Sequence, residues 1–497
     1  MTHEKLNAED HLRQVRIDKL DKIRALGDNP YPYKCEVTHH AGSLQETYKD
    51  LSNETETGDQ VAVAGRVMSN RNSGMFIDLQ DVTGRIQIFS NSDCLNAHSL
   101  KILDLVDLGD WISVKGFIRR TKRGELTINA QELSIISKAL LPLPEKYHGL
   151  ADIEKRYRQR YLDLIVTEES RTRLRNRSNI IQTLRSLLTE RGFLEVETPM
   201  LQTIPGGAAA KPFITHHNSL DMSMYLRIAP ELFLKRLIIG GLSDKVFEMN
   251  RCFRNEGLSP RHNPEFTMVE MYQAFADYHD LMELAETLVS TVAQTVLGTM
   301  KVTYGDHEID FTPPWDRRTM TSLVEEKTGV DFNLIQGDAE ARAAAIKACP
   351  DVQVPKGATW GEVIALLFEE KVEEHLIQPI HVIDLPLDIS PLAKVHQHDP
   401  RLTERFETFV NRWEVANAFS ELNDPLDQFE RFKKQVTQQE AGADETHPMD
   451  EDFVTALEHG MPPTGGLGIG IDRLVMLLTN APSIRDVIAF PTMRPKE

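Results

Sequence analysis

The spacing of apolar positions changes along the chain, and the changes divide it into segments. Over 10–26, apolar residues recur at helical spacing with arginines and lysines between them, and Gly27 follows as a stop. From about 60 to 138 the period becomes two, which predicts five strands. These strands run over 61–68, 75–80, 85–90, 111–118 and 125–136. A helical stretch at 98–106 separates the third strand from the fourth.

Five strands with one helix after the third match the five-stranded OB barrel, whose face and loops bind oligonucleotides. Phe76, Phe89 and Phe117 could stack on bases, although the same rings could instead fill the barrel core. The polar candidates on or beside the same face are Arg66, Arg71, Gln80, Gln87 and Glu132.

A stretch with prolines and a glycine follows the strands and predicts an interdomain linker at 146–160. We therefore expect a first domain over 1–145, with the N-terminal helix and the barrel. A second domain over 161–497 mixes helical and strand patterns. Two helical stretches inside it indicate a small helical insertion around 315–395.

Composition and charge limit where this protein can work and what it can bind. The 497 residues contain no run of about 20 apolar residues that would span a membrane, and no apolar secretion signal. The four cysteines are far apart, which argues against a structural zinc site or a disulfide framework and favours the cytoplasm. The net charge of -19 argues against a nucleic-acid partner, but basic residues crowd 115–123 and weaken that objection.

Two sequence blocks place a helix next to a strand. In one, an amphipathic helix over 174–191 is followed by a strand over 193–199. In the other, a glycine-rich strand over 465–470 runs into a helix with Arg473 at the junction. The second block lacks the GK[ST] of a Walker A loop and the GxGxxG spacing of a dinucleotide fold. Its glycines would instead let a ligand lie close to the strand.

A third block lies between them and is rich in charge. Residues 246–257 and 265–272 are strand-like, and the loop that joins them contains Arg, His and Asn. The charged and polar side chains at its centre are Arg254, Glu256, Arg261 and His262. Such a hairpin can aim cations at a triphosphate. The alternative is a surface hairpin whose charges are solvated.

In chain order, these blocks resemble the three signature motifs of class II aminoacyl-tRNA synthetases, whereas the HIGH and KMSKS signatures of class I are absent. Residues 254–270, 228–237 and 419–425 further resemble the bacterial lysine enzymes of subclass IIb. The resemblance implies an α+β fold, with an N-terminal five-stranded OB β-barrel that binds the anticodon. A class II catalytic domain, built on an antiparallel sheet flanked by helices, would follow. It also implies a homodimer whose contact element is the helix of the first block.

The resemblance assigns roles at the ATP site. In the family, the amino-acid carboxylate attacks the α-phosphate of ATP and releases pyrophosphate, and the aminoacyl group then passes to the terminal ribose of tRNA. Arg254 would bind the α-phosphate and neutralise charge in the transition state, and Phe266 would stack on adenine. The other ATP-binding positions would be Glu256, Arg261, His262, Asn263 and Arg473.

The pocket for lysine should be negative to meet the substrate ammonium, and Glu231 and Glu421 are the best candidates. The positions that complete this pocket are Gly207, Glu270, Tyr272, Asn417 and Phe419. Glu407 and Glu414 resemble the family's Mg²⁺ carboxylates, and more than one Mg²⁺ ion per site is expected. The anticodon would meet Arg66, Phe76, Gln87 and Glu132.

Glu407 and Glu414 are seven residues apart, a spacing that puts them on opposite faces of a regular strand. A joint metal site therefore needs a bulge or an irregular turn. The chain also departs here from the family's GGREIGNGF-like pattern, with Trp413, Ala416 and Ala418 in place of its residues.

Three alternatives stay open. The aspartate and asparagine enzymes of the same subclass would need a pocket for a carboxylate or an amide, which Glu231 and Glu421 do not suit. A paralogue that lysylates another acceptor would not need an OB barrel. A non-catalytic RNA-binding protein on this scaffold would not need the ATP-site arginines or the paired carboxylates.

Overall fold

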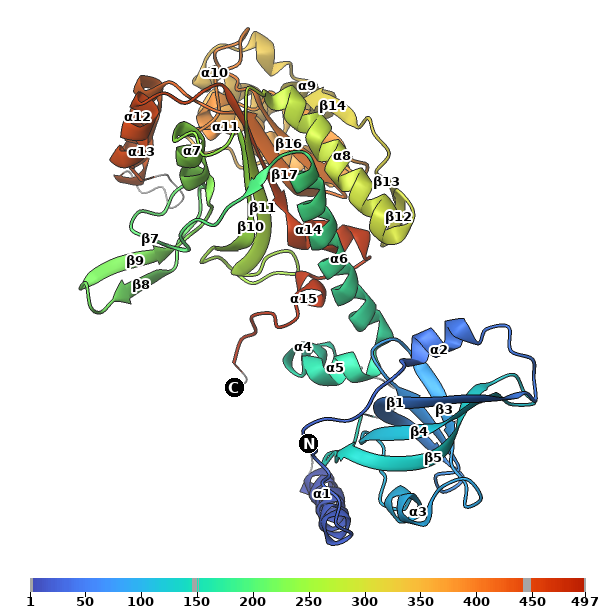
Figure 1. Cartoon of the computed structure of the whole chain (residues 1–497). Coiled ribbons are helices and arrows are strands. Elements are labelled where there is room, and N and C mark those ends of the chain that lie inside the picture. Colours follow the sequence, from blue (N-terminus) through green and yellow to red (C-terminus); the bar gives the residue numbers. More distant parts are fainter. Residues whose placement is uncertain (1–2, 145–149, 151, 441–447, 496–497) are drawn as a thin grey trace. The chain divides into compact units, whose positions relative to one another are not determined.

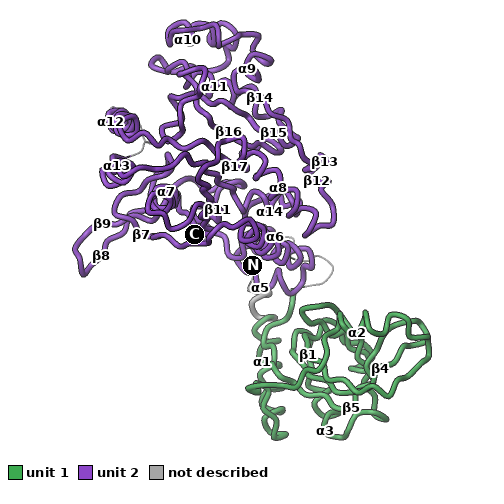
Figure 2. Tube along the Cα trace, turned by 45° about the horizontal axis from the view of Figure 1, so that its top comes forward, with its two compact units in different colours: residues 1–151 green, residues 152–497 purple. Residues whose placement is uncertain are grey.

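The structure, a computed structural model, describes residues 3–144, 150, 152–440 and 448–495. The chain forms two compact units, residues 1–151 and 152–497 (Figure 2). Each unit has its own hydrophobic core. No helix in the described ranges combines the length and the apolar character that crossing a membrane requires.

Unit 1 is built around a closed barrel with the strand order β1-β2-β3-β5-β4 (Figure 1). The strands are β1 (Glu56–Arg71), β2 (Phe76–Gln80), β3 (Arg85–Phe89), β4 (Trp111–Arg120) and β5 (Leu126–Ser137). Helix α3 (Ala97–Leu103) lies between β3 and β4 in sequence, and α1 (His3–Ala25) and α2 (Ala41–Thr47) precede the barrel. The predicted five-stranded barrel, with its helix after the third strand, is confirmed.

The alternation of side chains explains why these strands form a closed layer. Along β4, Ile112, Val114 and Ile118 are fully buried, while the residues that alternate with the buried positions, Ser113, Lys115 and Phe117, are partly exposed. Helix α1 docks on the barrel through its cations as well as its apolar face. Arg16 Nη1 donates to the carbonyl oxygens of Ala139 and Leu141, at 3.0 Å each. The N-terminal helix is therefore part of unit 1.

Unit 2 begins with two short helices, α4 (Ile153–Arg158) and α5 (Arg160–Val166). Of the predicted linker at 146–160, residues 146–149 and 151 lie outside the described residues, whereas most of the remainder is helical. Helix α4 thus occupies part of the predicted linker, from residue 153 onward.

A buried arginine fixes this segment within unit 2. Arg160 is fully buried, and its guanidinium donates to the carbonyl oxygens of Arg485, Ile488 and Ala489. The hydroxyl of Tyr157 also donates to Asp486 Oδ1, at 3.2 Å. Because buried carbonyl groups need donors, these bonds tie α4 and α5 to the C-terminal segment.

The centre of unit 2 is an eight-stranded sheet in the order β14-β15-β16-β17-β18-β11-β10-β6. The pairs β14–β15 and β10–β6 are parallel, and the others are antiparallel. The strands are β6 (Leu194–Glu195), β10 (Lys245–Phe253), β11 (Glu265–Ala274), β14 (Asp316–Thr319), β15 (Ile380–Ile383), β16 (Arg405–Val410), β17 (Trp413–Ser420) and β18 (Thr464–Gly470). The predicted strand at 193–199 shortens to the two residues of β6.

Helices flank this sheet on both faces (Figure 1). The four that frame it are α6 (Glu168–Glu190), α7 (Glu231–Ile239), α8 (Tyr278–Leu297) and α14 (Ile471–Leu478). Phe247 and Met271 point toward α6, α8 and α14, with which they share one core. Their strand neighbours Val246 and Tyr272 point the other way and pack with α7. The predicted helix-flanked, largely antiparallel sheet is confirmed.

The segment predicted as a helical insertion, around 315–395, is only partly helical. Its helices α9 (Met320–Thr328), α10 (Asp338–Ala348) and α11 (Trp360–Lys371) share a separate core. The same segment also supplies β14 and β15 to the main sheet.

The remaining elements are shorter or lie apart from the sheet. They are β7 (Leu201–Gln202), β8 (Ile214–His217), β9 (Met222–Leu226), β12 (Lys301–Tyr304), β13 (His307–Asp310), α12 (Pro425–Glu440), α13 (Glu451–Glu458), α15 (Ile484–Val487), η1 (Phe332–Leu334), η2 (Glu373–His375) and η3 (Leu387–Ile389).

Candidate active site

A large cavity, with a volume of about 1090 Å³, lies on the sheet face opposite α6, α8 and α14. The two-residue period of the strands builds its floor. On β11, Glu270 and Tyr272 line the cavity, whereas Val269 and Met271 join the core beneath. On β18 the cavity-lining positions include Gly466, so the floor there is bare backbone.

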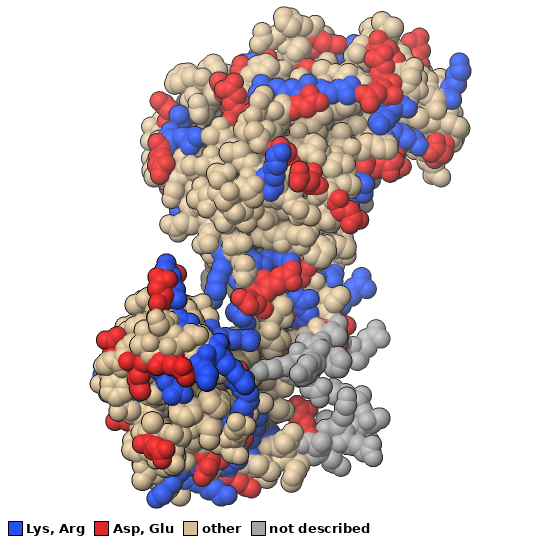
Figure 3. All heavy atoms as spheres, turned by 90° about the vertical axis from the view of Figure 1, so that its right-hand side faces the viewer, with Lys and Arg blue, Asp and Glu red and all other residues tan. Residues whose placement is uncertain are grey.

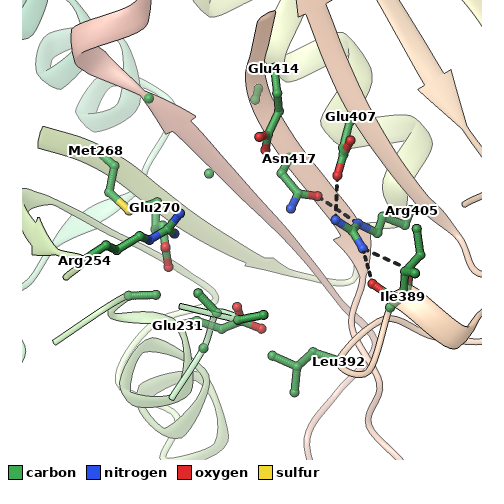
Figure 4. A pocket seen from close by; sticks show the side chains of 18 of the residues that line it. Glu231, Arg254, Met268, Glu270, Ile389, Leu392, Arg405, Glu407, Glu414 and Asn417 are labelled. Carbon is green, nitrogen blue, oxygen red and sulfur yellow. Dashed lines mark hydrogen bonds and ion pairs between the residues drawn. The ribbon is translucent and has the colours of Figure 1, made fainter. Parts of the chain in front are cut away.

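Every residue predicted to bind ATP, lysine or Mg²⁺ lines this cavity. These residues are Gly207, Glu231, Arg254, Glu256, Arg261, His262, Asn263, Phe266, Glu270, Tyr272, Glu407, Glu414, Asn417, Phe419, Glu421 and Arg473. Figure 4 shows several of them projecting into one space from elements that are far apart in sequence. The four residues predicted for the anticodon lie in unit 1.

The loop between β10 and β11 forms an arginine-rich end of the cavity. The N–H of Arg254 donates to Pro264 O at 2.9 Å and closes the base of the loop. The Arg254 guanidinium lies 5.1 Å from the centre of the Phe266 ring, and its Nε is buried without a hydrogen-bond partner among the described residues. A buried donor without a partner is costly, so this group suits an anionic ligand such as phosphate.

Arg261, on the same loop, packs against Trp413, which in turn packs against Tyr304. Its guanidinium lies 5.3 Å from the centre of the Trp413 ring, and Trp413 packs edge-on against Tyr304 at 5.1 Å. Trp413 is only 7% exposed. The bulky residue that departs from the family pattern therefore gives Arg261 a cation–π platform.

His262 and Arg473 meet at the same end. Arg473 Nη2 lies 3.1 Å from His262 Nε2, and Nη1 donates to Glu414 O at 2.6 Å. A guanidinium can only donate, so Nε2 accepts and the ring proton is on Nδ1, which donates to Ser259 Oγ at 2.9 Å. Burial, followed by the charge of Arg473, lowers the pKa of His262 and keeps the ring neutral near pH 7.

Glu407 and Glu414 lie on the adjacent strands β16 and β17. Glu407 pairs with Asn417, but a register shift between Thr408 and Phe409 pairs Phe409 with Glu414. This shift is the bulge that the sequence required if both carboxylates were to face one cavity.

The turn between these strands has a left-handed backbone. Asn411 and Arg412 have φ values of 49° and 68°. Both lie where the family pattern has glycines, and asparagine adopts this conformation more readily than arginine does. The hairpin therefore keeps its tight two-residue turn without glycine.

Arg405 organises the carboxylate side of the cavity (Figure 4). It donates to Glu407 Oε1 at 2.6 Å, to Asn417 Oδ1 at 3.1 Å and to Ile389 O at 2.7 Å. Burial raises the pKa of Glu407 to about 7, while Arg405 opposes this rise and Glu414 adds to it. The two glutamates are thus close enough to repel each other.

This donor set fits Mg²⁺. Within the described ranges, no group of three or more His, Cys, Asp or Glu side chains could hold a metal ion. Mg²⁺ is commonly bound through one or two carboxylates together with substrate phosphates. Glu407 and Glu414 supply such a pair in the cavity that also holds the arginine-rich loop.

The other end of the cavity is acidic and has one buried cation behind it. Glu231, Glu270 and Glu421 are at most 6% exposed. Lys235 Nζ lies 2.5 Å from Glu231 Oε1 and 2.5 Å from Glu421 Oε2. Glu421 Oε1 is buried and has no hydrogen-bond partner in the part of the chain that the structure describes. The hydroxyl of Tyr272 donates to Glu270 Oε2 at 3.3 Å.

Burial perturbs the titration of these acids. It raises the pKa of Glu270 to about 8, with a further rise from Glu231. It also raises the pKa of Glu421 well above its usual range, and Lys235 is the largest influence in the opposite direction. An added ammonium group would favour the ionised forms of both, so this end of the cavity suits a cationic ligand.

Two glycines give these side chains the space that they occupy. A Cβ atom on Gly466 would overlap Glu421 Oε1 and the Tyr272 ring. Gly207 has a φ of +88°, and a Cβ atom there would lie 2.9 Å from Glu231 Cβ. Both positions therefore exclude any larger residue.

In unit 1, two of the four predicted anticodon residues lie together. Phe76 is on β2 and Gln87 on the neighbouring β3. The Phe76 ring is 5.2 Å from that of Phe89, and the Arg119 guanidinium lies 4.3 Å over Phe89. Figure 3 shows a band of Lys and Arg side chains on one side of this unit.

The other two predicted anticodon residues lie elsewhere on the barrel. Arg66 pairs with Gln80, at the far end of β2 from Phe76, and its Nη1 donates to Gly109 O at 2.9 Å. Glu132 is exposed on β5, opposite Lys115 of β4.

Among the residues that sequence reasoning missed are two that hold the predicted carboxylates in place, Lys235 and Arg405. Lys235 follows Glu231 by four residues on a helix, a spacing at which side chains meet. Arg405 precedes Glu407 by two residues on a strand and so shares its face. These spacings could have indicated both contacts.

Known proteins share the folds of both units. A family model for class II tRNA synthetases of the D, K and N group matches residues 152–494, and a model for an OB-fold nucleic acid binding domain matches 61–136. The chain belongs to the class II tRNA synthetases.

Individual relatives refine this assignment. The chain is 56% identical over 483 residues to a protein named lysine–tRNA ligase from Sinorhizobium medicae, with 97% of each chain covered. It is 52% identical over 499 residues to the protein of that name from Carboxydothermus hydrogenoformans, with both chains covered completely. The predicted family and its lysine branch are confirmed.

Proposed function

We propose that this chain works as a lysine–tRNA ligase. It joins L-lysine to ATP, releases pyrophosphate and forms lysyl-adenylate, and then transfers lysine to the 3′-terminal ribose of its tRNA. The observation that carries this proposal is one cavity with arginines at one end and three buried carboxylates at the other. The relatives that bear this name support it.

The first step needs no protein nucleophile, because the lysine carboxylate is already an anion. Catalysis therefore depends on positioning and on neutralising charge. Arg254 is the catalytic residue: it binds the α-phosphate through its partly buried guanidinium and neutralises the charge that builds up there. Phe266 stacks on adenine beside it.

The outer phosphates of ATP lie against the loop and the start of α14. Arg261 and Arg473 donate to phosphate oxygens from two sides, and neutral His262 positions Arg473 by accepting a hydrogen bond from it through Nε2. Glu256 lies at the rim of this region. Asn263 acts by holding the loop, since its amide donates to Glu265 O at 2.6 Å and accepts from a main-chain N–H.

Glu407 and Glu414 would hold Mg²⁺, more than one ion in all, which would neutralise phosphate charge when bound. Arg405 holds Glu407 and Asn417 in place at this position.

Lysine lies with its side-chain ammonium between Glu231 and Glu421. The walls of this pocket are Gly207, Glu270, Tyr272, Asn417 and Phe419. A neutral amino acid would leave buried carboxylates uncompensated, and an acidic one would be repelled. The pocket therefore disfavours aspartate and asparagine as substrates.

Unit 1 reads the anticodon, and Phe76, Gln87, Arg66 and Glu132 are the proposed contacts. The proposed domains are 1–145 for the anticodon and 161–497 for catalysis, joined by a linker at 146–160 and with an insertion around 315–395. We propose that the active form is a homodimer whose two subunits contact each other through α6. We also propose that it works in the cytoplasm. The four cysteines, all of them free, suit a reducing compartment.

Lysine-dependent ATP–pyrophosphate exchange tests this proposal. The intact chain should exchange pyrophosphate with lysine and with no other standard amino acid. Arg254→Ala should remain folded and lose exchange by several orders of magnitude, because the charge at the α-phosphate is then uncompensated. Exchange with aspartate or asparagine but not with lysine would refute the assignment of substrate. Unimpaired exchange in Arg254→Ala would refute the role of that arginine.

A further inference from the structure

The two carboxylates assigned to the substrate ammonium already share a cation of the chain itself. Lys235 is fully buried, and its Nζ is 2.5 Å from one oxygen of Glu231 and 2.5 Å from one oxygen of Glu421. Its ammonium also lies 5.4 Å from the centre of the Phe419 ring. Such a site costs much desolvation and is tolerated only because both partners are charged.

Lys235 lies behind the carboxylates and not in the space that a substrate would fill. Glu231 and Glu421 line the cavity, whereas Lys235 does not. Glu421 turns its Oε1 atom toward Gly466 in the cavity floor, and this oxygen is buried without a hydrogen-bond partner in the described ranges. Each carboxylate is therefore bound to Lys235 through one oxygen, and Glu421 keeps the other for a ligand.

The charges around Glu421 show what the ammonium of Lys235 does. Glu231 and Glu270 both act to raise the pKa of Glu421, as does burial, and Lys235 is the largest influence that lowers it. Glu270 has its own pKa raised to about 8 and is mostly neutral near pH 7 in the ligand-free chain. Lys235 therefore favours the ionised form of Glu421 against burial and the two neighbouring carboxylates.

We infer that Lys235 is a positioning and specificity-determining residue, an internal counterion that bridges Glu231 and Glu421 and aims both carboxylates so that the pocket accepts one further cation. When both carboxylates are ionised, Lys235 balances only one of their charges, and the ammonium of lysine balances the other. This inference rests on the proposed function, because it assigns Lys235 a part in selecting that substrate.

Lys235→Met tests the role of the cation. The KM for lysine in pyrophosphate exchange should rise at least about tenfold, the size of one charge-assisted hydrogen bond, because Glu421 then loses the cation that orients it and favours its ionised form. The KM for ATP and the kcat should change less than about twofold, since the arginine-rich end is untouched. The matched control is Arg236→Met on the same helix, whose guanidinium pairs with Asp450 and does not line the cavity. This control should leave the KM for lysine unchanged.

A double-variant cycle with Glu421→Gln separates a counterion from a merely structural residue. Glu421→Gln should raise the KM for lysine strongly in the unmodified chain. Glu421→Gln should raise the KM for lysine much less in Lys235→Met, where Glu421 has already lost the cation that orients it and favours its ionised form. Lys235→Met with Glu421→Gln leaves one buried carboxylate without its cation instead of two, so it keeps the test available if Lys235→Met alone folds poorly.

Several results would overturn the inference. They are an unchanged or lower KM for lysine in Lys235→Met, a parallel rise in the KM for ATP, or equal costs of Glu421→Gln in both backgrounds. A lower KM would identify Lys235 as a competitor of the substrate. Loss of lysine-dependent exchange in the unmodified chain would instead refute the proposed function, so the two failures are distinguishable.

Discussion

The ionisation states of single side chains in this cavity depend on burial more than on their neighbours in the sequence. Glu270 is the clearest example, because burial raises its pKa to about 8. Between the ordinary pKa of about 4.5 and this value, the folded chain binds a proton that the unfolded chain has lost. The stability of the ligand-free chain contributed by this group therefore falls as pH rises through that window.

The same shift predicts how lysine binding depends on pH. Glu231, Tyr272, Arg254 and Arg227 are the charged or titratable groups that act on Glu270. If the bound ammonium ionises Glu270, binding releases one proton below about pH 8. The KM for lysine at saturating ATP should then fall by up to about tenfold per pH unit between pH 6 and 8, and level off above. Glu270→Gln should remove this slope, and a slope that persists in Glu270→Gln would contradict the assignment.

The sequence predicted the cavity residues well because most lie within motifs whose spacing is local. Glu407 and Glu414 needed a bulge that no local pattern revealed, and the structure supplies it between β16 and β17. The bridge from Lys235 to Glu421 joins residues nearly two hundred positions apart, so only the folded sheet brings them together.

At the scale of elements, the β16–β17 hairpin connects the carboxylates with the arginine-rich loop. Its turn carries Asn411 and Arg412 in the left-handed region, and Trp413 immediately follows. The same hairpin therefore presents Glu414 and also supports Arg261 through the tryptophan ring.

We expect Trp413→Leu to weaken ATP binding through Arg261. A cation–π contact is worth about 0.5–2 kcal/mol, which corresponds to about a two- to thirtyfold rise in the KM for ATP. The KM for lysine should be unchanged. In an Arg261→Ala background the substitution should have no further effect on the KM for ATP. An effect of equal size in both backgrounds would mean that Trp413 acts by packing alone.

Helices and strands whose apolar residues recur at a regular spacing were predictable from the sequence, and those without such a spacing were not. The barrel strands and β18 carry the alternation or the glycines that identify them. Strand β14 has the sequence DRRT, which has no apolar position, and it forms only because it pairs with β15. Helix α4, IEKRYR, buries one side chain, Tyr157, and so lacks a pattern to distinguish it from a linker.

At the scale of the whole molecule, the two units have separate cores and carry separate candidate sites. Adenylate formation uses the cavity of unit 2, whereas the proposed anticodon contacts are in unit 1. A change in unit 1 should therefore affect only steps that involve tRNA.

Phe76→Ala tests this division. Loss of one base-stacking ring costs about 1–3 kcal/mol of RNA binding, so the KM for tRNA in the charging reaction should rise about five- to a hundredfold. Lysine-dependent pyrophosphate exchange should be unchanged. Equal loss of both activities would show that Phe76 supports the barrel instead.

Gly466 has a consequence for how this pocket can evolve. Even a methyl group at this position would overlap Glu421 and Tyr272. A substitution of Gly466 therefore requires the side chains of these two residues to move as well. A duplicated copy under selection for a different amino acid would have to change the acidic wall first and this strand afterwards. Gly58, where an added methyl group would meet no atom within 4 Å, is free to drift in the meantime.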